Sequence, residues 1–389
     1  MAHTELSPPR VLDGSIRLPD RTVLVHDYLN QYGGAERVLE ALHAMAPGAP
    51  VVTSLYLPEA LPSFYRTWNI RPLWVNRIPG AHHHHQRMLP FYPSAFERVR
   101  LPRCELVLST SSAFAKMVRP PAGATHVSYI HSPMRFAWDL ESYIKRERLP
   151  AVALPALRPL MAYMRRRDRA TAARVHRFIA NSTVVQARIR AFWRRDAVVV
   201  HPPVDVERFT PAPPDAVGDY FLMVSRLVPY KRFDVAIEAA NVLHLPLWIV
   251  GDGRDRAALE RLAGPTVRFL GRVSDDELAE LYARCRAAVF MSEDDFGIAQ
   301  VEAQAAGRPV VAYAAGGAYD TVVPDVTGVL VKEQTVSSMI DAVNRFEQLQ
   351  FDPDVLVQHA RRFSRERFQR ELLAVVETAL AERGADGWN

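Results

Sequence analysis

Short apolar segments alternate with segments of helical periodicity along most of the chain, and this alternation constrains the fold more than any other feature. The first apolar segment is Arg21–His26, and amphipathic helical patterns lie, for example, at 234–243, 254–263 and 275–284. Near-continuous apolar strands alternating with helices are typical of parallel sheets covered by helices on both faces. We therefore expect an α/β protein, with further strands at 51–55, 106–109, 126–130, 178–180, 197–200, 220–224, 247–250, 267–270, 287–290, 309–313 and 328–331.

A proline-rich stretch interrupts the alternation once. Residues 201–214 contain five prolines, which neither a helix interior nor a central strand accommodates. A chain of 389 residues is also long enough for two domains. We expect two doubly wound Rossmann-like domains that face each other across a cleft, with ligands at the carboxyl ends of the strands. The expected order is a disordered tail at 1–20, an N-terminal domain at 21–203, a linker at 204–214, a C-terminal domain at 215–353, and a helix at 354–389 that packs back toward the first domain.

The two halves of the chain differ in charge. Residues 1–200 hold 28 Lys and Arg against 14 Asp and Glu, a net charge of +14, whereas residues 201–389 hold 20 against 29, a net charge of −9. A basic half favours an anionic partner, such as a membrane face, a phosphate-bearing substrate or nucleic acid. The sequence contains no signal-peptide pattern and no run of 18 apolar residues, so we expect a cytoplasmic protein with at most peripheral membrane contact. Cys104 and Cys285 fit neither a disulfide framework nor a zinc site.

A glycine pair follows the first apolar segment. Gly33 and Gly34 stand in the sequence NQYGGAE, at the point where the expected strand leads into a helix. Glycine lets the backbone approach a ligand closely, and a helix start offers N–H groups to an anion. Paired glycines also make ordinary turns, and the stretch is not a G-x-G-x-x-G fingerprint, so this motif alone identifies no ligand.

Two cations follow the first apolar segment of the C-terminal domain. Arg226 and Lys231 lie five residues apart, after the strand and before the next helix, where both can neutralise a diphosphate. The chain has only four lysines beside 44 arginines, so a lysine at this place is conspicuous. The alternative is a solvated helix start without a ligand.

An acidic loop precedes another helix further along the chain. Asp294 and Glu302 lie eight residues apart, with Phe296, Gly297 and Ile298 between them. Such a loop can direct backbone N–H groups and a carboxylate toward sugar hydroxyls, and a glutamate in the helix can accept hydrogen bonds from a ribose. Two acidic residues at this spacing also occur by chance, so the order of all these segments carries more weight than any one of them.

Seven motifs in order resemble glycosyltransferase family 4, which are retaining enzymes of GT-B fold. The motifs are Gly33-Gly34, HSPMR at 131–135, ANS at 180–182, PVDVERF at 203–209, SRLVPYK at 225–231, GDG at 251–253, and DDFGIAQVEA at 294–303. The resemblance runs from about residue 21 to 375. Within the family, YGGAER and HSPMRFAWD are most similar to O-antigen mannosyltransferases that use GDP-mannose, which implies transfer of mannose to a lipid-linked or saccharide acceptor in surface polysaccharide biosynthesis.

The resemblance implies a role for each matching residue. Gly33 and Gly34 would line the site near the donor phosphates and the acceptor, and His131 would lie beside the transferred sugar. Arg226 and Lys231 would clamp the diphosphate. The N-terminal domain would then bind a polyprenyl-diphosphate-linked or saccharide acceptor, and the C-terminal domain the nucleotide sugar.

The remaining roles concern the C-terminal domain. Glu302 matches the glutamate that binds the ribose, and Phe296, Gly297 and Ile298 match the loop that holds sugar and phosphate. Asp275 lies where some members meet the base and would accept hydrogen bonds from guanine. The family's first glutamate is Asp294 here, so either the shorter side chain alters sugar selectivity or the neighbouring Glu293 replaces it.

The chemistry follows from the charge that develops on the leaving group. Departure of the diphosphate creates negative charge, which Arg226, Lys231 and helix N-termini would stabilise. The acidic pairs at 275–276 and 294–295 are not an Asp-x-Asp metal site, so we expect no metal cofactor. Retention of the anomeric configuration is implied by the resemblance, and closure of the domains would exclude water.

Two charged segments lie outside these motifs. Leu157–Arg177 carries seven arginines among apolar residues and is expected to form a basic amphipathic helix, either a docking site for anionic lipid headgroups or a solvated face. Four histidines at His82–His85 are expected to be a surface run, with metal binding as the alternative.

Two other functions are compatible with the composition. A GT-B enzyme that uses a UDP-sugar or another donor is the first. The second is a nucleotide- or nucleic-acid-binding protein, but the sequence holds no helix-turn-helix, RNA-recognition or zinc-finger pattern. We therefore expect no nucleic-acid partner.

Overall fold

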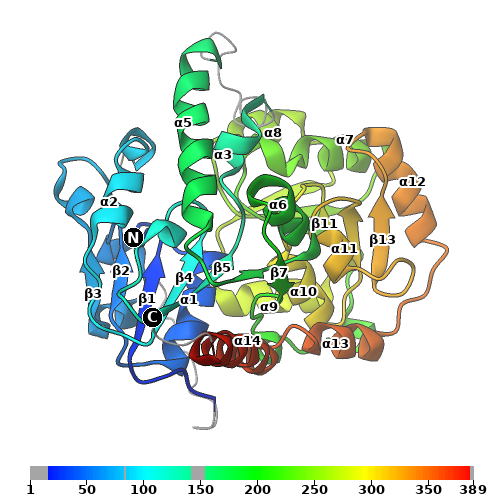
Figure 1. Cartoon of the computed structure of the whole chain (residues 1–389). Helices are drawn as coiled ribbons and strands as arrows, with labels where there is room; N and C mark the ends of the chain where they lie inside the picture. Colours follow the sequence, from blue (N-terminus) through cyan, green and yellow to red (C-terminus); the bar gives the residue numbers. More distant parts are fainter. Residues whose placement is uncertain (1–15, 83–84, 142–153, 386–389) are drawn as a thin grey trace. The chain divides into compact units, whose positions relative to one another are not determined.

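A computed structural model describes residues 16–82, 85–141 and 154–385. The chain divides into two compact units, each built around a parallel sheet (Figure 1). The described residues up to Pro203, together with those from Arg365 onward, form unit 1, and Val204–Ser364 form unit 2. The prediction of two doubly wound α/β domains is confirmed.

Unit 1 is organised around a seven-stranded sheet in the order β3-β2-β1-β4-β5-β6-β7, with every pair of neighbours parallel. The central strands are buried on both faces, which explains their uninterrupted apolar sequences. The strand order reverses between β1 and β4, the position where parallel sheets commonly bind ligands. The strands are β1 Thr22–His26, β2 Val51–Thr53, β3 Ile70–Pro72, β4 Leu106–Ser111, β5 Thr125–Ile130, β6 Arg177–Ala180 and β7 Ala197–Val199.

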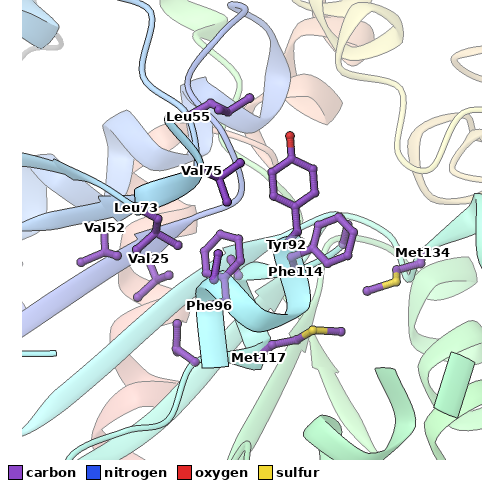
Figure 2. Packing of buried hydrophobic residues seen from close by; sticks show 14 of the residues in the cluster. Val25, Val52, Leu55, Leu73, Val75, Tyr92, Phe96, Phe114, Met117 and Met134 are labelled. Carbon is purple, nitrogen blue, oxygen red and sulfur yellow. The ribbon is translucent and has the colours of Figure 1, made fainter. Parts of the chain in front are cut away.

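Helices cover both faces of this sheet. One face packs on α1 and α14 through a core that includes Leu39 and Phe368, and the other packs on α2 and the start of α5. Figure 2 shows the second core, in which Tyr92 and Phe96 of α2 lie against Phe114 and Val75. The helices are α1 Gly34–Met45, α2 Tyr92–Arg98, α3 Arg135–Trp138, α5 Leu154–Ala172, α6 Thr183–Trp193 and α14 Arg365–Ala385.

Unit 2 contains a six-stranded parallel sheet in the order β10-β9-β8-β11-β12-β13. Its strands are β8 Phe221–Val224, β9 Leu247–Val250, β10 Val267–Gly271, β11 Ala287–Phe290, β12 Val310–Tyr313 and β13 Gly328–Val331. Its helices are α7 Phe233–Leu243, α8 Arg256–Leu262, α9 Asp275–Arg284, α10 Ile298–Ala305, α11 Ala318–Thr321, α12 Val336–Phe346 and α13 Pro353–Arg361. The order reverses between β8 and β11, so the loops after these two strands begin at the same edge of the sheet.

Three segments differ in detail from the sequence-based expectations. The stretch expected as a linker at 204–214 contributes Val204, Val206 and Phe209 to the core of unit 2. The expected terminal helix at 354–389 consists of two helices, of which α13 packs on α10 in unit 2 and α14 packs on α1 and β5 in unit 1. The expected tail at 1–20 is described only from residue 16, and Leu18 is buried in the unit 1 core. Residues 386–389 lie outside the described part of the chain.

Candidate functional site

Lys231 and Asp294 meet at the edge of the unit 2 sheet where the strand order reverses. Lys231 closes the short turn Pro229–Lys231 after β8, and Asp294 lies in the loop after β11. The Lys231 ammonium donates to both carboxylate oxygens of Asp294, at 2.7 and 2.9 Å, and the Ser292 hydroxyl donates to Oδ2 at 2.9 Å. Because 17% of the Lys231 side chain and 22% of that of Asp294 reach solvent, the pair remains accessible to a ligand.

The other cation of this loop has a different environment. Arg226 lies two residues after the end of β8 and is exposed, and within the described residues no hydrogen bond or ion pair holds its guanidinium. Glu293 lies half-buried beside Asp294, and the carboxylate that accepts the hydrogen bonds of Lys231 is that of Asp294. The sheet edge therefore presents one fixed cation and one exposed cation five residues apart.

Glycines allow four loops to pack backbone against backbone around this pair. A Cβ on Gly251 would lie 2.0 Å from the carbonyl oxygen of Ser225, and one on Gly253 would lie 2.2 Å from that of Leu227. Gly316 and Gly317 pack in the same manner, with ideal Cβ positions 2.1 Å from the carbonyl oxygens of residues 294 and 296. Since real Cβ atoms essentially never approach that closely, the GDG motif and its counterpart after β12 are needed to place the loops of Arg226 and Asp294.

The loop after β11 continues into α10. Gly297 precedes the helix with φ +97°, in the left-handed region that favours glycine, and Ile298 is the first helical residue. Glu302 lies one turn further along α10 and is 6% exposed. Phe296 is buried against Phe363, so its side chain belongs to the core of unit 2.

Asp275 lies on another element, at the first position of α9. Its carboxylate oxygen Oδ2 accepts a hydrogen bond from Nη1 of Arg208 at 3.0 Å. Ser274 and Glu277 form a capping box at this helix start. In the structure, therefore, the side chain expected to meet the base is engaged by an arginine of the PVDVERF motif.

His131 follows β5 in unit 1, at the carboxyl edge of the other sheet. Its backbone N–H donates to Ser111 O at 2.9 Å, and its ring packs edge-on against Tyr129. Burial, with a contribution from nearby His26, lowers the pKa of His131 to about 3. The imidazole is therefore neutral at physiological pH, and its Nε2 is buried with no hydrogen-bond partner among the described residues.

Gly33 and Gly34 begin α1 in the same unit. Gly33 is extended, with φ −171°, a conformation that any residue adopts, and a Cβ there would meet only Glu36 Oε2, at 3.5 Å. Neither backbone strain nor protein packing therefore requires glycine at position 33. A ligand that approaches the backbone closely would explain it.

Three buried polar residues at this edge, His26, Asp27 and Glu36, were not among the predicted site residues. The His26 ring hydrogen-bonds through Nδ1 to the Thr110 hydroxyl at 2.5 Å, and its Nε2 lies 3.5 Å from Glu36 Oε1. The buried Asp27 carboxylate accepts four backbone N–H bonds from the residues at 112–115. A signal was present, because His26 and Asp27 are the polar residues that end an otherwise apolar strand.

The basic segment Leu157–Arg177 is only partly helical. α5 ends at Ala172, and Arg177 begins β6. Five of its seven arginines bind other parts of unit 1, whereas Arg158 and Arg166 are exposed. The bound ones are Arg165 to Ala137 O, Arg167 and Arg174 to Glu97, Arg169 to Phe192 O, and Arg177 to Glu382.

A buried ion pair anchors α5 in unit 1. Lys116 Nζ lies 2.6 Å from Asp168 Oδ1, and the two side chains are 1% and 0% exposed. Asp168 Oδ2 also accepts the indole N–H groups of Trp138 and Trp193, at 2.6 and 2.7 Å. The lysine donates in addition to Asp168 O at 2.9 Å and to the Thr171 hydroxyl at 3.2 Å, so backbone and side-chain groups on α5 hold the ammonium in place.

The remaining sequence features give little more. His82 and His85 belong to the histidine run, and residues 83–84 lie outside the described part of the chain. Among the residues that the structure describes, no group of three or more His, Cys, Asp or Glu side chains is placed to hold a metal ion. No helix in the described ranges has the length and apolar character needed to cross a membrane.

Two family models match the chain, one in each unit. Residues 32–208 match Glycosyltransferase Family 4, and residues 212–366 match Glycosyl transferases group 1. Solved structures share the fold at low sequence identity. Anabaena HepE in complex with UDP aligns with a TM-score of 0.67 and 19% identity over 92% of this chain and 100% of that one. Sucrose-phosphate synthase from Thermosynechococcus elongatus aligns with a TM-score of 0.65 and 19% identity, over 93% and 98%.

Curated relatives match a smaller part of the chain. The D-inositol 3-phosphate glycosyltransferase of Actinosynnema mirum is 32% identical over 240 residues, which are 52% of this chain and 57% of the relative. The protein of the same name from Mycolicibacterium smegmatis is 31% identical over 234 residues, 53% and 54% of the two chains. The chain thus spans little more than half the length of these relatives. By its two domain matches and its fold, the chain belongs to the GT-B glycosyltransferases of family 4.

Proposed function

We propose that the chain transfers a sugar from a nucleotide-sugar donor, which unit 2 binds, to an acceptor that unit 1 binds. The observation that carries the proposal is the Lys231 ammonium, held by Asp294 at the edge of the unit 2 sheet where the strand order reverses. A fixed cation there stabilises the negative charge that develops on a departing diphosphate. The exposed Arg226 supplies a second charge beside it.

The other residues have supporting roles in this proposal. The backbone at Gly297 and Ile298 faces the donor phosphates at the start of α10, and Glu302 accepts hydrogen bonds from the ribose. In unit 1 the neutral His131 lies beside the reacting sugar, and Gly33 and Gly34 admit the acceptor. The reaction proceeds with retention of configuration and without a metal ion, so chelation by EDTA leaves the rate unchanged.

GDP-mannose is the donor that we propose. This choice of donor rests on the similarity of the YGGAER and HSPMRFAWD segments to O-antigen mannosyltransferases. A UDP-sugar is the competing candidate, because the HepE neighbours were solved with UDP and with UDP-glucose. In unit 2 the Asp275 carboxylate accepts a hydrogen bond from Arg208. Asp275 could bind guanine only after this contact breaks, and this argues against GDP.

The acceptor is proposed to be a polyprenyl-diphosphate-linked or free saccharide, used in the cytoplasm for surface polysaccharide synthesis. The curated relatives are named D-inositol 3-phosphate glycosyltransferases, so an inositol phosphate is the alternative acceptor class. The two acceptor classes are distinguished by supplying each with the donor that binds and by following the product.

The test begins with calorimetric titration of the purified protein with GDP-mannose, UDP-glucose and ADP-glucose. Binding of the GDP-sugar alone supports the proposed donor, and binding of the UDP-sugar alone refutes it. Arg226→Ala and Lys231→Ala should each abolish transfer while leaving the circular dichroism spectrum unchanged. Wild-type transfer rates in both variants would contradict the proposed site.

A further inference from the structure

Two large aromatic side chains of unit 1 are exposed next to each other. Trp74 is 47% exposed and Phe91 is 45% exposed, and their rings meet edge-to-face with centroids 6.1 Å apart. Burying apolar surface is favourable, so a paired exposed tryptophan and phenylalanine indicates an interaction surface more than a single exposed residue does.

The outward position of these rings is enforced by the core beneath them. Leu73 and Val75, which flank Trp74, are 6% and 0% exposed, and Tyr92, which follows Phe91, is 1% exposed. Figure 2 shows Leu73, Val75 and Tyr92 gathered in one core. Because the neighbours are fixed inside, neither ring can turn inward without disrupting that core.

The exposed charges of the chain segment that carries the pair are of one sign. Between residues 61 and 104 the sequence has seven arginines, one glutamate and no aspartate or lysine. The glutamate is Glu97, which is buried and neutralised by Arg167 and Arg174 from α5. Within the described residues the seven arginines are exposed and belong to no ion pair: Arg66, Arg71, Arg77, Arg87, Arg98, Arg100 and Arg103.

We propose that Trp74 and Phe91, with Arg71, Arg77 and Arg87 beside them in the chain, form an aromatic–arginine face that docks on an anionic lipid bilayer. Tryptophan and other aromatic rings partition into the headgroup region, and arginines near them bind lipid phosphates and anionic headgroups. The absence of exposed acidic residues across this segment fits a uniformly negative surface, whereas the surfaces of protein partners usually carry both signs.

This face is different from the basic helix α5. Most arginines of the Leu157–Arg177 segment bind other parts of unit 1, whereas those of the aromatic–arginine face are exposed and, within the described residues, belong to no ion pair. The proposal does not depend on the identity of the donor or of the acceptor. If the acceptor is lipid-linked, the face would hold the enzyme at the membrane that contains it.

The experiment is co-sedimentation of the full chain with vesicles, without any nucleotide sugar. One set of vesicles is phosphatidylcholine alone, and the other also contains phosphatidylglycerol. The wild type should bind the anionic vesicles, and Trp74→Ala/Phe91→Ala should lower the partition coefficient about tenfold or more. Circular dichroism confirms that the variant folds, and the substituted side chains are not in the proposed catalytic machinery.

Two matched controls identify the surface. Tyr319→Ala removes a 63% exposed aromatic from unit 2, and Tyr163→Ala removes a 47% exposed aromatic from α5. Both variants should bind vesicles like the wild type. A Tyr163→Ala defect with a normal Trp74→Ala/Phe91→Ala variant would assign membrane binding to α5 and overturn the proposal.

Two further results would also overturn it. One is an absence of wild-type binding to anionic vesicles. The other is self-association of the wild type in sedimentation velocity that the double variant abolishes, which would make the face an interface between copies of the chain. A protein that binds vesicles but transfers no sugar would leave this inference intact and refute only the proposed function.

Discussion

Among the residues that the structure describes, Lys116 and Lys231 each form an ion pair with an aspartate, and the pairs differ in their surroundings. Lys116 and Asp168 in unit 1 are 1% and 0% exposed, whereas Lys231 and Asp294 in unit 2 are 17% and 22% exposed. The N–O distances are nearly equal, 2.6 and 2.7 Å. The two pairs therefore join the same charged groups at nearly the same separation, and they differ in burial and in the groups around them.

The difference in burial determines what each pair can do. Around Asp168, two indole N–H groups and the lysine occupy the carboxylate, and no ligand can reach it. The ammonium of Lys231 lies at a sheet edge where diphosphates bind in folds of this kind, and water screens its attraction to Asp294. The first pair should therefore stabilise the fold, and the second should hold a charge ready for a substrate.

The largest effect is expected from breaking the buried pair. Lys116→Met leaves the Asp168 carboxylate buried without its cation, and this should lower the free energy of unfolding by about 3–5 kcal/mol. Urea denaturation followed by circular dichroism measures the change. A loss below about 1 kcal/mol would show that Lys116 stabilises the fold no more than a surface lysine does. That result would contradict the difference in role between the two ion pairs.

Lys231→Met should produce the reverse pattern. We expect the free energy of unfolding to stay within about 1 kcal/mol of the wild type, because exposed pairs contribute little. The rate of sugar transfer should fall about 10²- to 10³-fold, because the cation that stabilises the negative charge on the leaving group is removed. The matched control is Lys332→Met, an exposed lysine of the same unit, which should alter neither quantity.

The loop behind Asp294 provides a third test. Gly317→Ala places a Cβ 2.1 Å from Phe296 O, and the Gly317 N–H donates to Asp294 O at 2.8 Å. We expect a loss of about 2–3 kcal/mol in the free energy of unfolding and a displaced Asp294. Gly33→Ala is the control, because its Cβ would meet only a side-chain oxygen at 3.5 Å. Equal destabilisation by both substitutions would contradict the structural role given to Gly317.

The sequence was sufficient to predict the two sheets, because their buried strands are apolar and their helices amphipathic. It missed β3, Ile70–Pro72, since three residues with a proline and an exposed arginine do not resemble a strand. That strand lies at the edge of its sheet, where a proline is tolerated, and its pairing with β2 depends on tertiary contacts.

Side-chain pairing could not be predicted in the same way. Motif spacing indicated Lys231 and Asp294 separately, but their contact joins loops after two neighbouring strands that are distant in the sequence. The arginines near α5 suggested a lipid-binding helix, whereas tertiary contacts engage most of them within unit 1. Lys116 and Asp168 carried no pattern at all, because a buried ion pair resembles any two surface charges in a sequence.

The smallest effect that we predict is a pH dependence near the buried pair. His126 in β5 is fully buried, and burial, with the charges of His176 and Lys116, lowers its pKa to about 3. In the unfolded chain the histidine titrates near 6.5. Between these two values the unfolded state binds more protons than the folded state. Stability is therefore greatest above pH 6.5 and is lost as the pH falls toward 3.

Replacing His126 should reduce this slope. Each such histidine contributes up to about 1.4 kcal/mol per pH unit, so His126→Gln should flatten the dependence of unfolding free energy on pH between 5 and 6 by about that amount. His43, His131 and His359 also have pKa values lowered by burial, so part of the slope should remain. Urea unfolding at several pH values measures it. Lys231→Met, in the other unit, should leave the slope unchanged. A slope that His126→Gln does not flatten would contradict the assignment of this pH dependence to His126.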